Sequence, residues 1–190
     1  MDGLISGLNA QGGGSRVRLC FLSGALVITA ALLSVAAARA DEPLIVALGA
    51  SNTYGKGVAR RDAFPAHLER LLRARGVMAV VRNAGINGNT TAQMLARLRA
   101  AVPARTRVVV LQPGGNDFRR GISRGQYRAN IKRIKRRLRA RGIRVVMLRN
   151  RLIGKVARSH PRPDGQHFKS AGYRALARIL LPRVLSALRK

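Results

Sequence analysis

The sequence predicts an α/β fold, in which a parallel sheet of four to five strands is covered by helices on both faces. Two observations carry this prediction. From residue 44 onward, short apolar segments alternate with longer segments whose apolar residues repeat with the period of a helix. The short segments are apolar throughout rather than alternately apolar and polar, which is typical of strands buried on both faces.

The expected elements have local start and stop signals. The strands are expected at residues 44–48, 77–81, 108–111 and 143–148. The helices are expected at residues 63–75, 90–101, 123–141 and about 170–188. Thr90 or Thr91 can cap the second helix, and Gly76, Pro103 and Gly142 each follow the end of a helix.

Residues 1–40 have the order of a secretory signal peptide. Arg16 and Arg18 precede an uncharged apolar run over 19–35, and Ala38-Arg39-Ala40 fits the cleavage pattern. We therefore expect a domain over 41–190 that is periplasmic or secreted. The apolar run is long for a signal peptide, so the alternative is an uncleaved anchor in the inner membrane formed by residues 19–38.

Cysteine usage and charge exclude several classes of protein. Cys20, the one cysteine, lies in the predicted signal, so residues 41–190 can hold no disulfide, thiolate metal site or cysteine nucleophile. Residues 1–40 carry three Arg and one Asp, which leaves 34 basic and 6 acidic residues and a net charge of +28. The arginines are spread over every expected helix, so we favour ordinary solvated helix faces as the reason for this charge. The alternative is attraction to anionic lipid or polyanion surfaces. Specific nucleic-acid binding is not expected, because only four Phe and three Tyr could stack on bases.

Polar and glycine residues follow the expected strands. Ser51 comes after the first strand, residues 83–89 after the second and residues 114–117 after the third, while residues 164–167 precede the last helix. Because ligands bind at the carboxyl ends of parallel strands, we expect these segments to meet at one functional edge.

These residue types fit acyl transfer by a serine nucleophile. Ser51 needs a base, which His167 can provide, and Asp164 can fix the tautomer of that histidine. The Ser51 N–H, the Gly88 N–H and the Asn116 amide are the expected donors to the oxyanion. Acidic residues are scarce, since Asp117 and Asp164 alone follow Glu69, and both are expected in loops.

The other two histidines are weaker candidates for the base. His67 lies within an expected helix and is interpreted as a core or flanking residue, while His160 lies in a loop rich in Pro and Arg.

Four motifs in this order resemble those of the SGNH-hydrolase superfamily, also called GDSL esterases and lipases. They are Gly49-Ala50-Ser51, Asn83-Ala84-Gly85-Ile86-Asn87-Gly88-Asn89-Thr90, Gly114-Gly115-Asn116-Asp117 and Asp164-Gly165-Gln166-His167. The pattern is most similar to the bacterial periplasmic thioesterase I/lysophospholipase L1 branch. The resemblance implies a flavodoxin-like three-layer α/β/α fold and a Ser-His-Asp hydrolase that uses neither a cofactor nor a metal.

The sequence departs from the family pattern at two places. Ala50 stands where the family usually has an aspartate. This residue is neither the nucleophile nor the base, so its replacement leaves the triad intact and instead affects the position of the loop or the reaction rate. Only thirteen residues separate Asn150 from Asp164, where family members usually have a helix and a fifth strand. We expect little structure there beyond Leu152, Ile153 and Val156, so the sheet has four strands or a short fifth one.

The predicted function is hydrolysis of a small acyl ester, a thioester or a lysophospholipid. Deacetylation of an envelope polysaccharide would use the same residues. A catalytically weakened relative that keeps the fold and binds anionic envelope material is the alternative from another class. The motifs fix neither the leaving group nor an oligomeric state.

Overall fold

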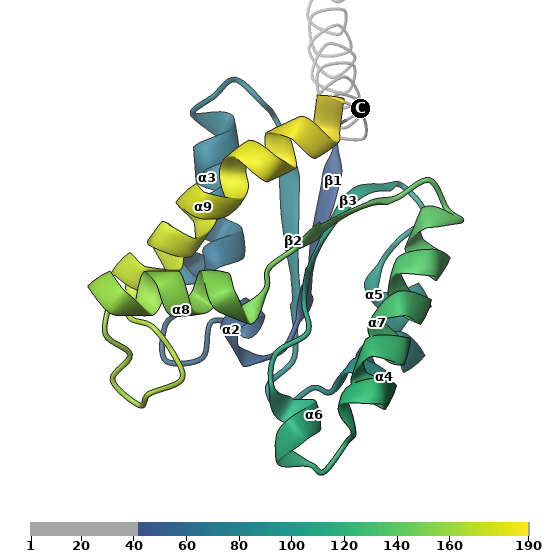
Figure 1. The fold of residues 1–190 in the computed structure, drawn as a ribbon. Coiled ribbons are helices and arrows are strands. Elements are labelled where there is room, and N and C mark those ends of the chain that lie inside the picture. Colours follow the sequence, from purple (N-terminus) through teal and green to yellow (C-terminus); the bar gives the residue numbers. More distant parts are fainter. Residues whose placement is uncertain (1–41, 190) are drawn as a thin grey trace, which may run out of the picture. The chain divides into compact units, whose positions relative to one another are not determined.

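A parallel four-stranded sheet forms the centre of residues 42–189, the part of the chain that the computed structural model describes (Figure 1). The strands are β1 (Leu44–Gly49), β2 (Val80–Gly85), β3 (Thr106–Gln112) and β4 (Arg144–Met147), in the order β2-β1-β3-β4. All neighbouring pairs are parallel, so the carboxyl ends of the strands share one edge. The predicted fold class is confirmed, with four strands.

Helices cover both faces of this sheet. Ile45 and Ala47 of β1 pack under α3 (Phe64–Arg73), α8 (Asn150–Ser159) and α9 (Ser170–Arg189). The alternate residues of β1, Leu44, Val46 and Leu48, pack under the opposite layer. That layer contains α4 (Thr91–Ala96), α5 (Leu98–Ala101) and α7 (Arg124–Arg139). Every β1 residue is buried, as the uniformly apolar segment predicted.

Short helices and specific caps begin the segments that follow the strands. α2 (Ser51–Tyr54) follows β1, the 3₁₀ helix η1 (Arg60–Asp62) precedes α3, and α6 (Asn116–Arg119) follows β3. Thr90 caps α4 through a capping box with Gln93, and the Ser123 hydroxyl accepts a hydrogen bond from the Gln126 N–H at the start of α7.

The second strand begins and ends later than predicted. Its observed register pairs Leu44 with Val80 and Gly49 with Gly85. Val77 instead closes the end of α3, because its N–H donates to the Leu72 carbonyl. β2 is an edge strand, so the polar residues Arg82 and Asn83 are tolerated in it. The prediction ended the strand at residue 81 because it followed only the apolar run.

The helix expected over 90–101 is broken into α4 and α5 at Arg97. The side chain of Arg97 turns inward and donates to the backbone carbonyls of Gly49 and Ala84, at 3.2 and 2.9 Å. The hydrophobic period continues across the break, since Met94 and Leu98 are both buried, and this is why the sequence pattern did not reveal it.

The segment after β4 forms the helix α8 rather than the sparse structure expected. Leu152, Ile153 and Val156 are buried beneath it, so the three apolar residues named from the sequence are the ones that hold it. Within residues 42–189 no fifth strand follows, and β4 is therefore the last strand on its side of the sheet.

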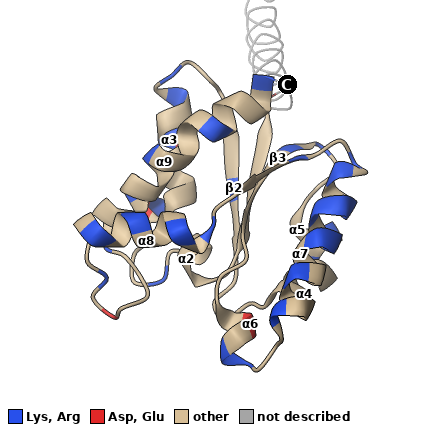
Figure 2. Cartoon of the chain, viewed as in Figure 1, with Lys and Arg blue, Asp and Glu red and all other residues tan. Residues whose placement is uncertain are grey.

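Basic side chains are distributed over α3, α7, α8 and α9, as the sequence predicted (Figure 2). None of the helices in the described part of the chain has the length and apolar character needed to cross a membrane.

Candidate active site

A pocket of about 290 Å³ lies at the carboxyl edge of the sheet. It brings together the segment after β1, the segment after β3, α8 and the loop before α9. Its lining includes the predicted residues Ser51, Asn116 and His167, together with Ala50, Asn52, Gln112, Gly114, Gly115, Arg119, Asn150, Ile153, Gly154, Arg162 and Gln166.

Ser51 is placed by a tight junction between β1 and α2. A Cβ atom on Gly49 would lie 2.2 Å from the Thr53 hydroxyl oxygen and 2.8 Å from the Gln112 carbonyl oxygen, so only glycine fits there. The next N–H, that of Ala50, donates to the Gln112 side-chain oxygen at 3.1 Å. Ser51 then begins α2, where its own backbone N–H has no carbonyl partner within the helix.

The Asp164–His167 pair is formed by a short turn. Asp164 Oδ2 lies 2.5 Å from His167 Nδ1, and Asp164 Oδ1 accepts hydrogen bonds from the N–H groups of Gln166 and His167 at 2.9 and 2.7 Å. The His167 side chain is 7% exposed and that of Asp164 is 50% exposed. The hydrogen bond from the His167 side chain, and next those from the two backbone N–H groups, hold the pKa of Asp164 well below its usual value.

Ser51 and His167 share the pocket without a direct hydrogen bond. No hydrogen bond joins their side chains anywhere in the described range 42–189, although both line the same 290 Å³ space. Catalytic hydrogen bonds are often long until a substrate is bound, so the arrangement is compatible with a nucleophile and its base.

Asn116 and Gly88 lie on two connected segments. The Asn116 amide donates one hydrogen bond to the Asn89 carbonyl at 2.9 Å, and its oxygen accepts one from Arg119 at 2.5 Å. Asn116 lines the pocket, whereas Gly88 does not. Gly88 adopts a left-handed backbone with a φ of 72°, which a residue with a side chain rarely takes. It belongs to the same loop as Asn89 and is thereby linked to Asn116.

Two residues that the sequence reasoning missed organise this edge. Gln112, the last residue of β3, accepts from both the Ala50 N–H and the Thr53 hydroxyl. Arg97 donates to Asn89 Oδ1 at 2.8 Å as well as to the ends of β1 and β2. Gln112 could have been noticed because it ends a strand at the functional edge, but nothing in the pattern around Arg97 distinguishes it from the many exposed arginines.

The wall of the pocket contains a further polar group. The Asn52 side-chain oxygen is buried and has no hydrogen-bond partner within residues 42–189. α8 contributes Asn150, Ile153 and Gly154 to the opposite side. The segment 151–163, in which little structure was expected, therefore supplies part of the pocket wall.

The remaining acid and histidine candidates are occupied elsewhere. Asp117 lies in α6 rather than in a loop, is fully buried, and accepts hydrogen bonds from Thr91. His67 is buried on α3, with Arg70 at 2.8 Å and Ser170 at 3.3 Å from its ring nitrogens. His160 contacts the Ser159 hydroxyl at the end of α8. None of the three lines the pocket.

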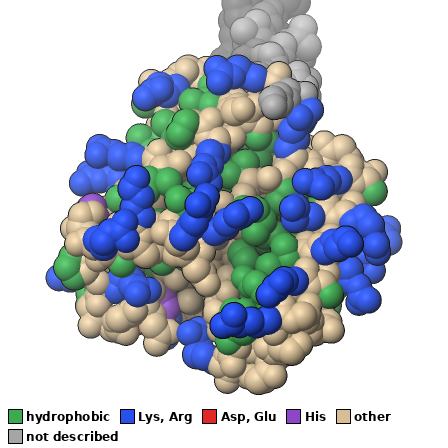
Figure 3. Space-filling model, in the orientation of Figure 1, with side chains coloured by type: hydrophobic (Ala, Val, Ile, Leu, Met, Phe, Trp, Pro, Cys, Tyr) green, Lys and Arg blue, Asp and Glu red, His purple; other side chains and the backbone are tan. Residues whose placement is uncertain are grey.

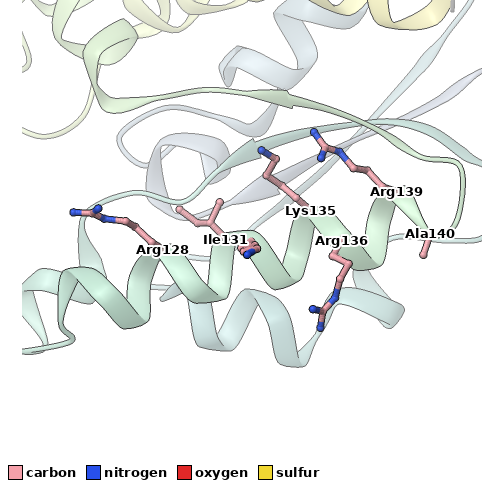
Figure 4. Close-up of a pocket in the computed structure, with 7 residues that line it drawn as sticks. Arg128, Ile131, Lys135, Arg136, Arg139 and Ala140 are labelled. Atoms are coloured by element: carbon pink, nitrogen blue, oxygen red, sulfur yellow. The ribbon is translucent and has the colours of Figure 1, made fainter.

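A larger hollow of about 760 Å³ lies along α7 and is lined by residues of that helix and by Ala140, which follows it (Figure 4). Its side chains are those of Lys and Arg with Ile131 and Ala140, so it contains no nucleophile and no acid. Over the part of the chain described, no group of three or more His, Cys, Asp or Glu side chains could hold a metal ion.

The fold and the pocket define a three-layer α/β protein whose serine, histidine and amide groups meet at the carboxyl edge of a parallel sheet. The sequence matches the GDSL-like lipase/acylhydrolase family over residues 47–181, most of the chain. The chain belongs to this family, which confirms the resemblance drawn from its four motifs.

Two relatives and two solved structures illustrate the similarity. Esterase TesA of Pseudomonas aeruginosa is 33% identical over 133 residues, covering 70% of this chain and 64% of that protein. Thioesterase 1/protease 1/lysophospholipase L1 of Escherichia coli is 32% identical over 130 residues, covering 68% and 60%. The chain thus spans less than two thirds of the length of these relatives.

A crystal structure of TesA aligns with a TM-score of 0.66 at 25% identity, covering 76% of this chain and 99% of that one. The SGNH-hydrolase family esterase AlinE4 aligns with a TM-score of 0.54 at 26% identity, covering 78% and 97%.

Proposed function

We propose that this protein hydrolyses carboxylic ester or thioester bonds, with Ser51 as nucleophile, His167 as general base and Asp164 as the group that orients the histidine. One observation carries the proposal: Ser51, Asn116 and His167 line one small pocket, and the Asp164 carboxylate lies 2.5 Å from the Nδ1 of that histidine. The names of the two relatives, an esterase and a thioesterase/lysophospholipase, support the same class of reaction.

The proposed reaction gives each of these residues one role. Asp164 accepts from Nδ1–H, which leaves the other ring nitrogen of His167 free to take the Ser51 proton. The Ser51 oxygen then attacks the carbonyl carbon, and the oxyanion accepts from the Ser51 N–H and the Asn116 amide, which line the pocket. The Gly88 N–H, the third donor named from the sequence, lies outside this lining and would have to move toward the bound substrate to donate. His167 passes the proton to the leaving group. Water, activated by the same histidine, attacks the acyl-enzyme to release the acid and restore the Ser51 hydroxyl.

The pocket favours a small, negatively charged substrate. Its volume of about 290 Å³ is at the lower end for ligand sites, which favours a short acyl group. Its charged lining residues are Arg119 and Arg162, with no carboxylate among them. A lysophospholipid or another ester with an anionic leaving group would complement these arginines. The positive net charge would also attract the protein itself to an anionic surface.

The test is loss of turnover in Ser51→Ala. Hydrolysis of p-nitrophenyl acetate should fall by about 10³-fold or more, because no other group in the pocket can form the acyl-enzyme. Labelling by a fluorophosphonate probe should disappear as well. Circular dichroism should be unchanged, because Ser51 is only partly buried.

Ser170→Ala is the matched control, because the Ser170 hydroxyl also lies beside a histidine, His67, and 3.4 Å from an Asp62 oxygen. This variant should keep full activity. If Ser170→Ala is inactive and Ser51→Ala is active, the site has been misassigned.

Export is a separate proposal. Residues 1–40 lie outside the described residues, and the sequence pattern alone supports a signal peptide cleaved after Ala40. Mass spectrometry of the protein from a periplasmic fraction should give a chain that begins at Asp41. An intact chain in the membrane fraction would favour an anchor formed by 19–38.

A further inference from the structure

The outer edge of β4 is open. β4 is the last strand in the order β2-β1-β3-β4, and within residues 42–189 it pairs with β3 alone. In a ladder, a strand directs its backbone N–H and C=O groups alternately to its two sides, so about half of those in β4 point away from β3. Residues 145–147 make no backbone hydrogen bond on that side in the described part of the chain.

Apolar side chains flank this edge. Val145 and Met147 are partly exposed and pack against the core cluster beneath α7, while Val146 belongs to the cluster beneath α8 and α9. Ile131 of α7 is also partly exposed. Figure 3 shows an apolar strip at the surface between α7 and the α8–α9 layer, with basic side chains along both sides.

Two adjoining hollows make this edge a groove. One, of about 460 Å³, lies over β4 itself and is lined by Arg144, Val145 and Val146 together with Arg139 of α7 and Arg183 of α9. The other is the hollow of about 760 Å³ along α7, and Arg139 lines both. We call these two hollows together the β4-edge groove. Its charged lining residues are all Lys or Arg.

The basic side chains along α7 have a spacing that suits an added strand. Arg128, Lys135 and Arg139 extend from the same side of α7 as Ile131, while Arg136 extends from another side (Figure 4). Arg128, Lys132, Lys135 and Arg139 follow one another every three or four residues, which places successive side chains about 5–6 Å apart along a helix. Side chains on one face of a strand repeat every two residues, about 6.7 Å. Acidic residues at alternate positions of a strand would therefore each lie near one of these cations.

We propose that the β4-edge groove binds an acidic, extended polypeptide segment of a partner protein, which adds a fifth strand to the sheet. The outward-facing backbone groups of residues 145–147 select a polypeptide, because a lipid acyl chain cannot hydrogen-bond them. The cationic lining selects an acidic sequence. A second copy of this chain does not fit the groove, since it carries the same excess of positive charge.

The probe for this proposal is a fluorescein-labelled octapeptide of alternating Glu and Val, with the Lys and Val octapeptide as its charge control. Fluorescence anisotropy with the chain from Asp41 should detect the Glu peptide but not the Lys peptide. Two further Glu peptides carry N-methyl groups, on the Glu residues or on the Val residues. A paired strand points only alternate N–H groups at its neighbour, so one of these peptides should bind and the other should not.

Two double variants of α7, each of which removes two positive charges, test the groove. Lys135→Gln/Arg139→Gln removes two cations of the groove and should weaken binding of the Glu peptide about tenfold. Arg133→Gln/Arg137→Gln has the same i, i+4 spacing on α7, and neither residue lines the groove. This control pair should change the affinity by less than about twofold. Hydrogen exchange of the amides of residues 145–147 should slow when the Glu peptide is added.

Three results would each overturn the proposal. Both N-methylated peptides could bind equally well, or the control pair could weaken binding as much as the groove pair, and either result would mean that charge alone attracts the peptide. Phosphatidylglycerol vesicles could displace the peptide and protect residues 145–147 in its place, which would identify a lipid. None of these measurements uses an ester substrate, so they are independent of the proposed hydrolysis.

Discussion

The side chain of Arg97 connects three segments of the chain at the functional edge. Its guanidinium donates to the carbonyls that end β1 and β2 and to Asn89, whose own carbonyl accepts from Asn116. Burial lowers the pKa of this arginine. The planar group serves three acceptors that a single ammonium cannot reach together.

We therefore predict that Arg97→Met lowers kcat for p-nitrophenyl acetate about 10- to 100-fold while KM changes little. The loop that carries Gly88 and Asn89 loses its anchor, and small displacements of oxyanion donors are costly. Arg97→Lys should recover only part of the rate. Arg99→Met, an exposed residue of α5, is the control and should be fully active. Unchanged kcat in Arg97→Met would mean that the loop holds its position without this residue.

At the scale of elements, the packing of α3 against α9 places a histidine where its charged form is disfavoured. His67 lies between Arg70 of its own helix and Ser170 at the start of α9. Burial, and next the charge of Arg70, lower the pKa of His67 from its ordinary 6.5, while Asp62 opposes and Arg174 adds to the shift. The unfolded chain therefore binds a proton at this residue more readily than the folded protein does.

Stability should fall as the pH is lowered through 6.5, because proton uptake then favours the unfolded state. Urea unfolding at pH 7.5, 6.5 and 5.5 would measure this loss, and His67→Gln should reduce the slope. His160→Gln is the matched control, because it makes the same substitution outside the contact between α3 and α9. Asp164 does not interfere, since the stability it contributes is lost only as the pH falls below its ordinary pKa of 3.8. An identical slope in His67→Gln would refute the assignment.

β4 illustrates a second consequence at this scale. The segment between β4 and α9 forms the helix α8 and a loop in place of a fifth strand, and the sheet ends on a strand of four residues. A short edge with cationic neighbours resists pairing with another copy of itself, which is how natural sheets avoid aggregation. The same features leave the edge accessible to an acidic strand.

For the whole molecule, the excess of 37 basic over 7 acidic residues produces a long-range positive field. We predict that kcat/KM for a monoanionic ester such as mono-p-nitrophenyl glutarate falls several-fold between 20 mM and 500 mM NaCl, because salt screens this field. The neutral p-nitrophenyl acetate should respond by less than about twofold over the same range. Equal salt responses of the two esters would show that the field does not guide the substrate.

The sequence by itself determined the α/β alternation, both helical layers and the edge at which Ser51, Asn116 and His167 meet. These properties follow from local apolar periodicity, from glycine positions and from the rule that the carboxyl ends of parallel strands share one edge of the sheet. Each can therefore be predicted from the residues of a single segment. The pairing of Asp164 with His167 belongs here too, because three residues and one turn bring them together. The catalytic roles of these residues remain predictions, which Ser51→Ala tests.

Only the tertiary structure decided the register of β2, the inward turn of Arg97, the position of Gln112 beneath Ala50 and the contribution of α8 to the pocket wall. Each depends on contacts between residues far apart in the chain, which local composition and periodicity do not reveal. The open edge of β4 is the clearest case, because whether a strand has one neighbour or two is a property of the sheet and not of the strand's own sequence.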